Sequence, residues 1–478
     1  MRSIKTTSSA HRLRWAVVLM LVLPAGCQSY HDKPLTPEAV MRALRTPTWN
    51  DLRVAAAKTS SEQLPKTMLS PSQGITPETA AVLAVILNPS LRAMRDAHGE
   101  ASAQLLQAGI LTNPIITGSF GEITGGFRTD TFNPYGIGVA WNIRQLIDRQ
   151  ARISSARYGL KEVDLEVAWR EWQTAQAARL AVYAMATAKE QLHEALVARR
   201  ALDKVYTIAR RAAGEGLIPL YTLGVALTAS QQASALVLTF RQHFARSQLD
   251  LARAMGLAPQ TVFTLSPTVR LPTVVHLPDV VNLEHNVENR RLDLLALHKG
   301  YQSQQERLRA AVLRQFPSVS IGFAQNSDAN NVHTTNFGVS IGLPIFDRNQ
   351  GRIALAKATR RALYDDYIAR VFVARSDIAT AAMNIRLLQR RIHQAESAVG
   401  KYRGLVNRDR QGLHIQSINI QAYAAAMEQL AMGRIGLVQL QYRLARNLIA
   451  LELSSGDAFF KQHNTPTTTD SNRSGDAQ

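Results

Sequence analysis

The sequence predicts a mainly α-helical protein with a membrane β-barrel portion. Three observations lead to this fold class. The chain contains two copies of one long segment, short stretches in each copy alternate apolar with small residues, and the predicted helices are too long for a compact domain. Each copy is predicted to run helix, strand, strand, long helix, returning helix.

The repeat is visible as landmarks that recur in the same order. The matched pairs are Tyr135–Val139 with Phe337–Ile341, Asp148–Ile153 with Asp347–Ile353, and Glu215–Leu217 with Gln411–Leu413. The first pair is offset by 202 residues and the last by 196. Solenoid repeats have periods of roughly 20–50 residues, so a domain-scale element is duplicated here.

Each copy opens with a helix, predicted from Thr76 to about Leu111 and from near Glu284 to Arg314. Thr76-Pro77-Glu78 is a helix start, with a capping residue and then proline in the first turn. The long helices are predicted over 148–213 and 350–410. Each ends at a glycine, and the returning helices run to about 255 and 453. At 1.5 Å per residue the long helices reach roughly 90–100 Å, so they need lateral partners along their length, as in coiled coils.

The strands carry the sharpest pattern. Tyr135, Ile137, Val139, Trp141 and Ile143 alternate with glycine, alanine and asparagine, and 318–324 and 337–345 alternate in the same way. The strand after Pro114 is the weakest of the four. Apolar residues on one face and small or polar residues on the other are typical of outer-membrane barrel strands. A half-buried sheet on a soluble domain is the alternative.

Four strands cannot close a barrel, because the smallest barrels need about eight. The hydrocarbon core of a bilayer does not tolerate open strand edges. If these strands span a membrane, the protein must therefore form an oligomer. No apolar run is expected to be long enough for a spanning helix, which needs about 20 residues.

The N-terminus resembles an export signal. Basic residues precede the apolar stretch Trp15–Leu23, and small residues lead to Cys27, the one cysteine of the chain. This arrangement resembles the lipobox of bacterial lipoproteins, although Pro24 replaces the usual leucine. The resemblance implies lipidation (palmitate) at Cys27 and outer-membrane sorting. A simple signal peptide with a chance cysteine is the alternative.

The chain has a formal net charge of +19, but its arginines and lysines are scattered along amphipathic segments. Nucleic-acid binders gather such residues on one face or in a tail, so no nucleic-acid partner is predicted. A cationic surface suits anionic lipid headgroups instead. No catalytic, cofactor or metal-ligating motif is found, and the prediction is that the protein is not an enzyme.

Three motifs make the chain similar to the TolC family of outer-membrane efflux ducts. They are Leu87–Leu91, Thr112–Pro114 and the run Gly342–Gly351, which reads Gly-Leu-Pro-Ile-Phe-Asp-Arg-Asn-Gln-Gly. The last run is most similar to heavy-metal resistance ducts of the CzcC and CusC kind. The first copy departs from it, because Trp141–Arg144 replaces Leu-Pro-Ile-Phe.

The resemblance implies a homotrimer with a TolC-like α-barrel tunnel and a 12-stranded β-barrel, four strands per protomer. It also implies a periplasmic adaptor (membrane fusion) protein, an inner-membrane RND-type pump, and a lipid-anchored position in the outer membrane. The cargo would be heavy-metal cations. Drug efflux or type I secretion through the same fold is one alternative, and a non-transporting periplasmic coiled-coil lipoprotein is another.

The same resemblance gives the two Gly-Leu turns a role. Gly216-Leu217 and Gly412-Leu413 would form the tips that dock the adaptor, and Arg408, Asp409 and Arg410 beside them would form a periplasmic gate together with Arg210 and Arg211. The alternatives are ordinary glycine C-caps and solvated helix ends.

The predicted segments are a signal peptide (1–26), an N-terminal extension (27–75), the first repeat (76–256), a connector (257–283), the second repeat (284–455) and a polar tail (456–478).

Overall fold

The computed structural model describes residues 29–45, 54, 74–126, 131–259, 261–414 and 420–459. The chain divides into two compact units, residues 1–46 and 47–478. The first unit contains the short helix α2 (Pro37–Ala43), which begins where the Thr36 hydroxyl accepts a hydrogen bond from the Ala39 amide. All other elements belong to the second unit.

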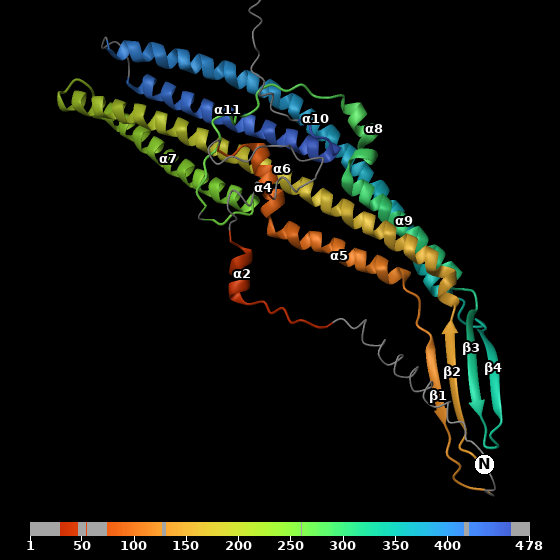
Figure 1. Ribbon diagram of the computed structural model, residues 1–478. Coiled ribbons are helices and arrows are strands. Elements are labelled where there is room, and N and C mark those ends of the chain that lie inside the picture. Colours follow the sequence, from red (N-terminus) through yellow and green to blue (C-terminus); the bar gives the residue numbers. More distant parts are fainter. Residues whose placement is uncertain are drawn as a thin grey trace, which may run out of the picture. The chain divides into compact units, whose positions relative to one another are not determined.

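The second unit is mostly helical with one small sheet, which confirms the coarse fold prediction (Figure 1). Its elements follow the same order twice. The first series is α4 (Pro77–Leu87), α5 (Pro89–Gly109), β1 (Ile115–Phe120), β2 (Tyr135–Asn142), α6 (Arg144–Gly214) and α7 (Leu220–Ala254). The second is α8 (Val280–Arg290), α9 (Leu292–Leu313), β3 (Ser318–Ser327), β4 (His333–Gly342), α10 (Gln350–His414) and α11 (Ile420–Ser455).

The opening helix of each repeat is two helices, so the prediction of one continuous helix was wrong in both copies. In the first copy the break is at Asn88, whose ψ of 118° is extended because Pro89 follows it. In the second copy the break is at Arg291, with ψ of 117° and no proline. Thr76 caps α4, as predicted, and does so through a capping box with Thr79.

The sheet has the order β1-β2-β3-β4, and every neighbouring pair is antiparallel. It lies at one end of the long helices (Figure 1). The predicted fourth strand ends too late. β4 stops at Gly342, and Leu343 and Ile345 lie beyond it, because Pro344 cannot donate to a strand ladder.

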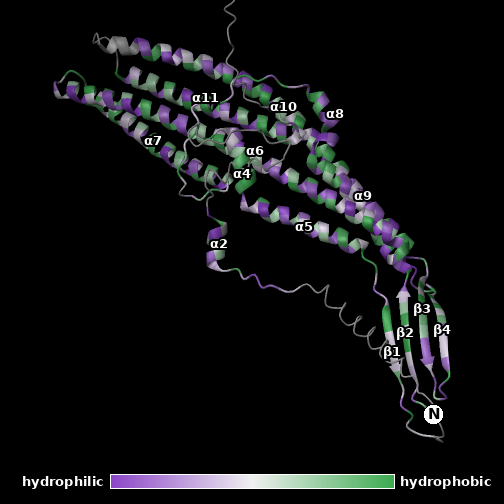
Figure 2. Cartoon of the chain, in the orientation of Figure 1, coloured by the Kyte–Doolittle hydropathy of each residue, from purple (hydrophilic) through white to green (hydrophobic). Residues whose placement is uncertain are grey.

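The helices pack in one layer. α6 contacts α5 and α7 on one side and α9 and α11 on the other, and α10 contacts α9 and α11. α4 packs on α6, while α8 packs on α10. The core is a series of small clusters along the layer, rich in alanine and leucine. Apolar residues accordingly form short stripes along each helix, except in the largely apolar α4 (Figure 2).

Candidate functional site

The sheet carries its large apolar side chains on one face. Ile116 is paired with Val139, Val139 with Phe323, and Phe323 with Phe337, so they form one row across all four strands. Trp141, Ile321 and Val339 form the next row. Phe323, Phe337, Val339 and Val139 are exposed, although exposed apolar patches of this kind are unusual on soluble monomers.

The opposite face of the sheet is small and polar. Gly138 is paired with Ala324, Ala140 with Gly322, and Ser320 with Ser340. A face of this kind can line water without bulky side chains blocking it, whereas the first face suits hydrocarbon. The predicted two-faced pattern is therefore present in register in the half of the sheet next to the helices, except at Ile115, while farther out Gln325 and Thr335 share the apolar face with Ile137.

Both outer strands of the described sheet, β1 and β4, have one unpaired edge. Unpaired edges in a membrane leave backbone amides and carbonyls without partners, and each such group costs several kcal/mol there. The sheet is thus incomplete in one copy of the chain if it spans a bilayer.

A second incomplete surface runs along α10. The repeats match with an offset of 200 in the long helices, since Ala178 and Ile378, Val182 and Ala382, and Met185 and Ile385 are all buried. On α6 another stripe is buried as well: Trp172 is 7% exposed and Tyr183 is 4% exposed. Their counterparts on α10, Phe372 and Met383, are 72% and 53% exposed.

The cover over the α6 stripe is α11. Tyr183 packs against Ala445 and Ile449 of α11, and Glu194 of α6 pairs with Arg434 of α11 at 3.0 Å. The helix that matches α11 in the first repeat is α7, which lies at the other edge of the layer. The exposed stripe of α10 thus corresponds to the stripe of α6 that the returning helix α11 covers. Sequence reasoning missed this stripe, although aligning the repeats at an offset of 200 shows Phe372 opposite Trp172.

The seam between α6 and α11 also contains a buried polar cluster that was not predicted. Glu452 is fully buried and accepts hydrogen bonds from Arg179 and, at 3.1 Å, from Gln176. Arg179 donates to the Gln176 side-chain oxygen at 2.8 Å. Removing one partner of such a buried pair leaves an uncompensated charge, so the loss of either Arg179 or Glu452 alone would destabilise the contact between the two repeats.

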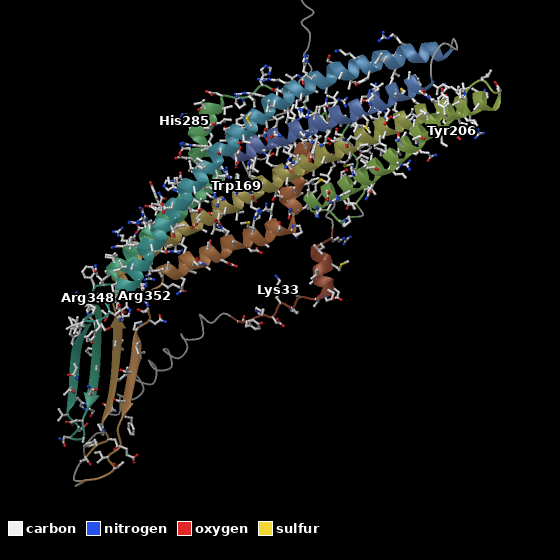
Figure 3. All side chains as sticks on the ribbon, turned by 180° about the vertical axis from the view of Figure 1, so that it is seen from behind. Lys33, Trp169, Tyr206, His285, Arg348 and Arg352 are labelled. Carbon is white, nitrogen blue, oxygen red and sulfur yellow. The ribbon has the colours of Figure 1, made fainter. Side chains whose placement is uncertain are left out.

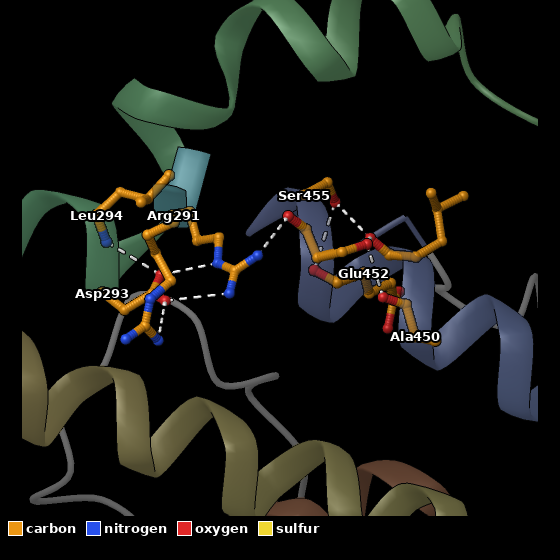
Figure 4. A network of polar contacts seen from close by, with 9 residues as sticks. Arg291, Asp293, Leu294, Ala450, Glu452 and Ser455 are labelled. Atoms are coloured by element: carbon orange, nitrogen blue, oxygen red, sulfur yellow. Dashed lines mark hydrogen bonds and ion pairs between the residues drawn. The ribbon is translucent and has the colours of Figure 1, made fainter. Parts of the chain in front are cut away.

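Arg291 forms a second polar network at the α8–α9 break (Figure 4). Its guanidinium donates to both carboxylate oxygens of Asp293, at 2.8 and 3.1 Å, and to the Ser454 carbonyl at 3.5 Å. It also lies 5.1 Å from the ring centroid of Trp169 on α6. These contacts join α9, α11 and α6 at one place along the layer.

The first predicted tip, Gly216-Leu217, follows α6 in a Schellman motif. Gly216 has φ of +71°, and the Gly216 and Leu217 amides donate to the carbonyls of Ala213 and Ala212. Leu217, Leu220 and Tyr221 are exposed. A groove of about 370 Å³ lies between α7 and α11 nearby, with Tyr221, Gly224 and Gln421 in its wall.

The second tip differs from its prediction. Gly412 and Leu413 lie inside α10, which continues to His414, so Gly412 does not end the helix. At the offset of 200, α6 and α10 end together at Gly214 and His414. Aligning the two Gly-Leu pairs shifts the tips by four residues, about one helical turn. Residues 415–419, between α10 and α11, are outside the described chain.

Of the predicted gate residues, Arg408 is exposed on α10, and Arg210 and Arg211 are exposed on α6. The side chains of Asp409 and Arg410 are outside the described residues, as is Cys27. The tip core beneath them joins α6, α7, α10 and α11 through Val205, Val406 and Tyr423.

One helix in the described part of the chain, α7, is long and apolar enough to cross a membrane by length and composition. This corrects the expectation that no segment reaches that length. α7 is uncharged from Leu220 to Phe240, and it packs along α6. Among the described residues, no group of three or more His, Cys, Asp or Glu side chains could hold a metal ion.

Comparison with known proteins gives a sequence match for the second repeat. Residues 283–457 match the family model described as "Outer membrane efflux protein". In sequence, the second repeat is similar to outer membrane efflux proteins. No match to a curated protein sequence was found.

Solved structures extend the likeness to the whole fold. CusC, described in connection with transmembrane channel formation, matches with a TM-score of 0.68 at 17% identity, over 90% of this chain and 99% of that one. VceC from Vibrio cholerae matches with a TM-score of 0.67 at 16% identity, over 80% and 97%. The Campylobacter jejuni CmeC outer membrane channel matches with a TM-score of 0.65 at 14% identity, over 91% and 94%. The chain therefore has the fold of outer-membrane channels.

Proposed function

We propose that this protein is the outer-membrane exit duct of a tripartite efflux system. One observation carries the proposal: next to the helices, the sheet has rows of large apolar side chains on one face and mostly small or polar side chains on the other, and its outer strands leave two open edges. Such a sheet is stable in a bilayer only when further strands close it. Three copies supply twelve strands, a number within the range of known barrels.

The helices support the same assembly. α10 exposes Phe372 and Met383 where α6 buries Trp172 and Tyr183, and α11 packs on Tyr183. In a ring of copies, α7 of the next copy occupies the place over α10 that α11 occupies over α6. Every long helix then has a returning helix on each side, and the barrel continues into a helical tunnel.

Further parts of the proposal concern anchoring and partners. Cys27 is proposed as the lipid anchor in the outer membrane. The ends of the two long helices, with Gly216 and Leu217 after α6 and Gly412 and Leu413 in the last turn of α10, are proposed to dock a periplasmic adaptor that connects the duct to an RND-type pump. The exposed apolar residues Leu217 and Tyr221 and the adjacent groove suit a packed helical partner. Arg408, Asp409 and Arg410 are proposed to narrow the periplasmic end.

For the cargo, the run Gly342–Gly351 favours heavy-metal cations, and CusC is among the solved structures of the same fold. Small organic cations are the second candidate, because the helix layer contains a pocket with suitable chemistry, described below.

The test of the duct is electrical. The full chain, purified from outer membranes and added to a planar bilayer, is expected to give discrete channel openings and to run as a heat-modifiable trimer. A soluble monomer with no conductance would contradict the proposal.

The test of the cargo is separate. A strain that lacks its own outer-membrane duct, and that carries this chain with its pump and adaptor, is challenged with copper, zinc or ethidium. Restored growth on the metals alone supports metal export, and restored growth on ethidium supports the second candidate.

A further inference from the structure

An open pocket of about 320 Å³ lies where the α8–α9 break meets the end of α11, between α6 and α10. Its wall includes side chains from all of these elements: Trp169, Gln173, Arg291, Asp377, Thr380, Asn384, Asn447. Sites for small organic molecules occupy about 300–1,000 Å³, so this pocket is large enough for one. Trp169 lies part-way along α6, far from both the sheet and the tip (Figure 3).

The pocket opens on the face of the layer that faces away from α8. Arg375 of α10 pairs with Glu288 of α8 at 2.9 Å, and Gln389 donates to the Val275 carbonyl of the connector at 2.7 Å. Asp377 lies two residues after Arg375, about 200° around the helix. Asn384 lies five residues before Gln389, about 140° around the helix. Both pocket residues therefore point away from the side of α10 that contacts α8 and the connector. In the proposed tube, we place the face covered by α8 and the connector outside, because these elements would otherwise fill the tunnel. The pocket then opens into the tunnel.

The cation already in the pocket is neutralised. Arg291 is 8% exposed, and Asp293, whose carboxylate also lies 4.0 Å from Arg370, holds it in a two-pronged pair. Asp377 is exposed, and no basic side chain in the described part of the chain lies within 4.0 Å of its carboxylate. The Asp377 carboxylate is therefore the one unpaired charge among the described residues that line the pocket, and it is negative.

The remaining groups narrow the class of ligand. Trp169 provides an indole, whose face attracts cations, as its contact with Arg291 shows. Gln173, Asn384 and Asn447 provide neutral amides, which can donate and accept hydrogen bonds. A divalent metal ion prefers several carboxylate or imidazole ligands, and the pocket has one carboxylate. We propose that this pocket is a transit site in the tunnel wall for small organic monocations. The inference rests on the proposed duct.

The pocket residues are present where the two repeats pack within one chain, and their counterparts between chains differ. At the offset of 200 the counterparts of Trp169, Gln173, Asp377 and Asn384 are Ala369, Val373, Ala177 and Ala184. These residues provide no carboxylate, no amide side chain and no aromatic ring. A trimer would therefore carry the site at the three seams within chains and lack it at the three seams between chains.

The test uses the purified full-length trimer, with ethidium as the organic monocation and its fluorescence as the measure of binding. Asp377→Asn is expected to weaken ethidium binding about fivefold, the worth of roughly 1 kcal/mol for an exposed ion pair. Trp169→Leu is expected to weaken it by a similar factor through loss of the cation–π contact. Zn²⁺ binding, measured by calorimetry, is expected to be the same in both variants and the wild type.

Asp366→Asn is the matched control. It removes the same charge from the same helix, eleven residues or about three turns earlier on the same side, and Asp366 does not line the pocket. Equal loss of ethidium binding in this control, or unchanged binding in Asp377→Asn, would overturn the site. Channel conductance is recorded for every variant. Normal conductance with failed ethidium binding refutes the site alone, whereas absent conductance in the wild type refutes the duct itself.

Discussion

The two repeats have the same backbone plan and different chemistry. The helix breaks at Asn88 and Arg291 have nearly equal dihedral angles, φ −60°, ψ 118° and φ −78°, ψ 117°. The returning helices end at Gly256 and Gly456, with φ of +73° and +76°. In each repeat, a Cβ on this glycine would lie 2.9 Å from backbone atoms of the helix break. In both repeats, the glycine after the returning helix therefore packs against the backbone of the helix break, and we call this contact the joint.

The side chains around the joint are not kept. In the first repeat, α5 and α6 are joined by an ion pair between Arg95 and Glu171 and by a hydrogen bond between His98 and Asp164 at 2.6 Å. In the second repeat, α9 and α10 are joined at matching places by ring contacts, His298 with Tyr367 and Tyr301 with Tyr364. Spacing and backbone geometry set how these helices pack, and polarity is free to vary between the copies.

The difference between α6 and α10 is of another kind. α6 buries its second stripe within the chain and α10 does not, although both helices are built alike. This asymmetry is what one chain of a ring should show.

Phe372→Glu combined with Met383→Glu is expected to abolish the trimer. Burial of each side chain contributes about 1.5–3 kcal/mol, and the variant replaces that gain with two charges at every interface. Size-exclusion chromatography with light scattering measures the change. Asp366→Lys is the control, because Asp366 is exposed about 120° around the helix from Phe372 and its counterpart on α6, Glu166, is exposed as well, and it should leave the trimer intact.

Glu452→Ala is expected to lower the free energy of unfolding by about 3–5 kcal/mol, because Arg179 would keep a buried charge without its carboxylate. Ala252, the counterpart of Glu452 in the first repeat, shows that the fold accepts alanine at this place when no arginine faces it. The double variant Glu452→Ala with Arg179→Met should therefore recover most of the loss. Urea unfolding followed by circular dichroism measures both, and no recovery would contradict the pairing.

Gly256→Ala and Gly456→Ala are expected to destabilise the fold equally, by about 1–3 kcal/mol, because each combines a positive φ with a close backbone neighbour. Gly216→Ala is the matched comparison. It has φ of +71° but nothing within 4 Å of a new Cβ, so about 1 kcal/mol is expected. A clear difference between Gly256 and Gly456 in thermal unfolding would show that the two joints are not equivalent.

The smallest effect is expected at Glu162 on α6. Burial, assisted by Glu166, raises the pKa of Glu162 above its ordinary 4.5, and Arg307 opposes the shift. Because the folded state holds the proton more tightly than the unfolded state, stability is highest below the unfolded pKa. It falls as pH rises through the folded pKa. Glu162→Gln should therefore be more stable than the wild type near pH 7 and equal to it below about pH 4. Equal stability at both pH values would contradict this assignment.

The sequence predicts the parts of this fold that rest on periodicity. Alternation in 135–142 and 337–342 predicts strands that the structure contains, and the 3.6-residue pattern predicts the long helices. The break at Asn88 also had a local signal, since the residue before proline avoids helical angles. The break at Arg291 had no proline signal; its side chain pairs with nearby Asp293 and donates to the distant Ser454 carbonyl of α11, a tertiary contact.

The candidate sites were less predictable for the same reason. Gly216 marks a real turn through its positive φ, while Gly412 is a helical residue, so the letters Gly-Leu alone could not place the second tip. The pocket at Trp169 depends on three helices that are distant in sequence. No local sequence pattern predicts that side chains from these separate helices meet in one pocket.

One cross-linking measurement tests the central claim that the next copy covers α10. Within the chain, Tyr183 of α6 packs against Ala445 of α11. The counterparts at the offset of 200 are Met383 and Ala245, both exposed. Cysteines at Met383 and Ala245 of the full chain, treated with a thiol cross-linker in intact membranes, are expected to link chains into a covalent trimer on a denaturing gel. Either cysteine alone should give no such product. A double variant that stays monomeric would contradict the account.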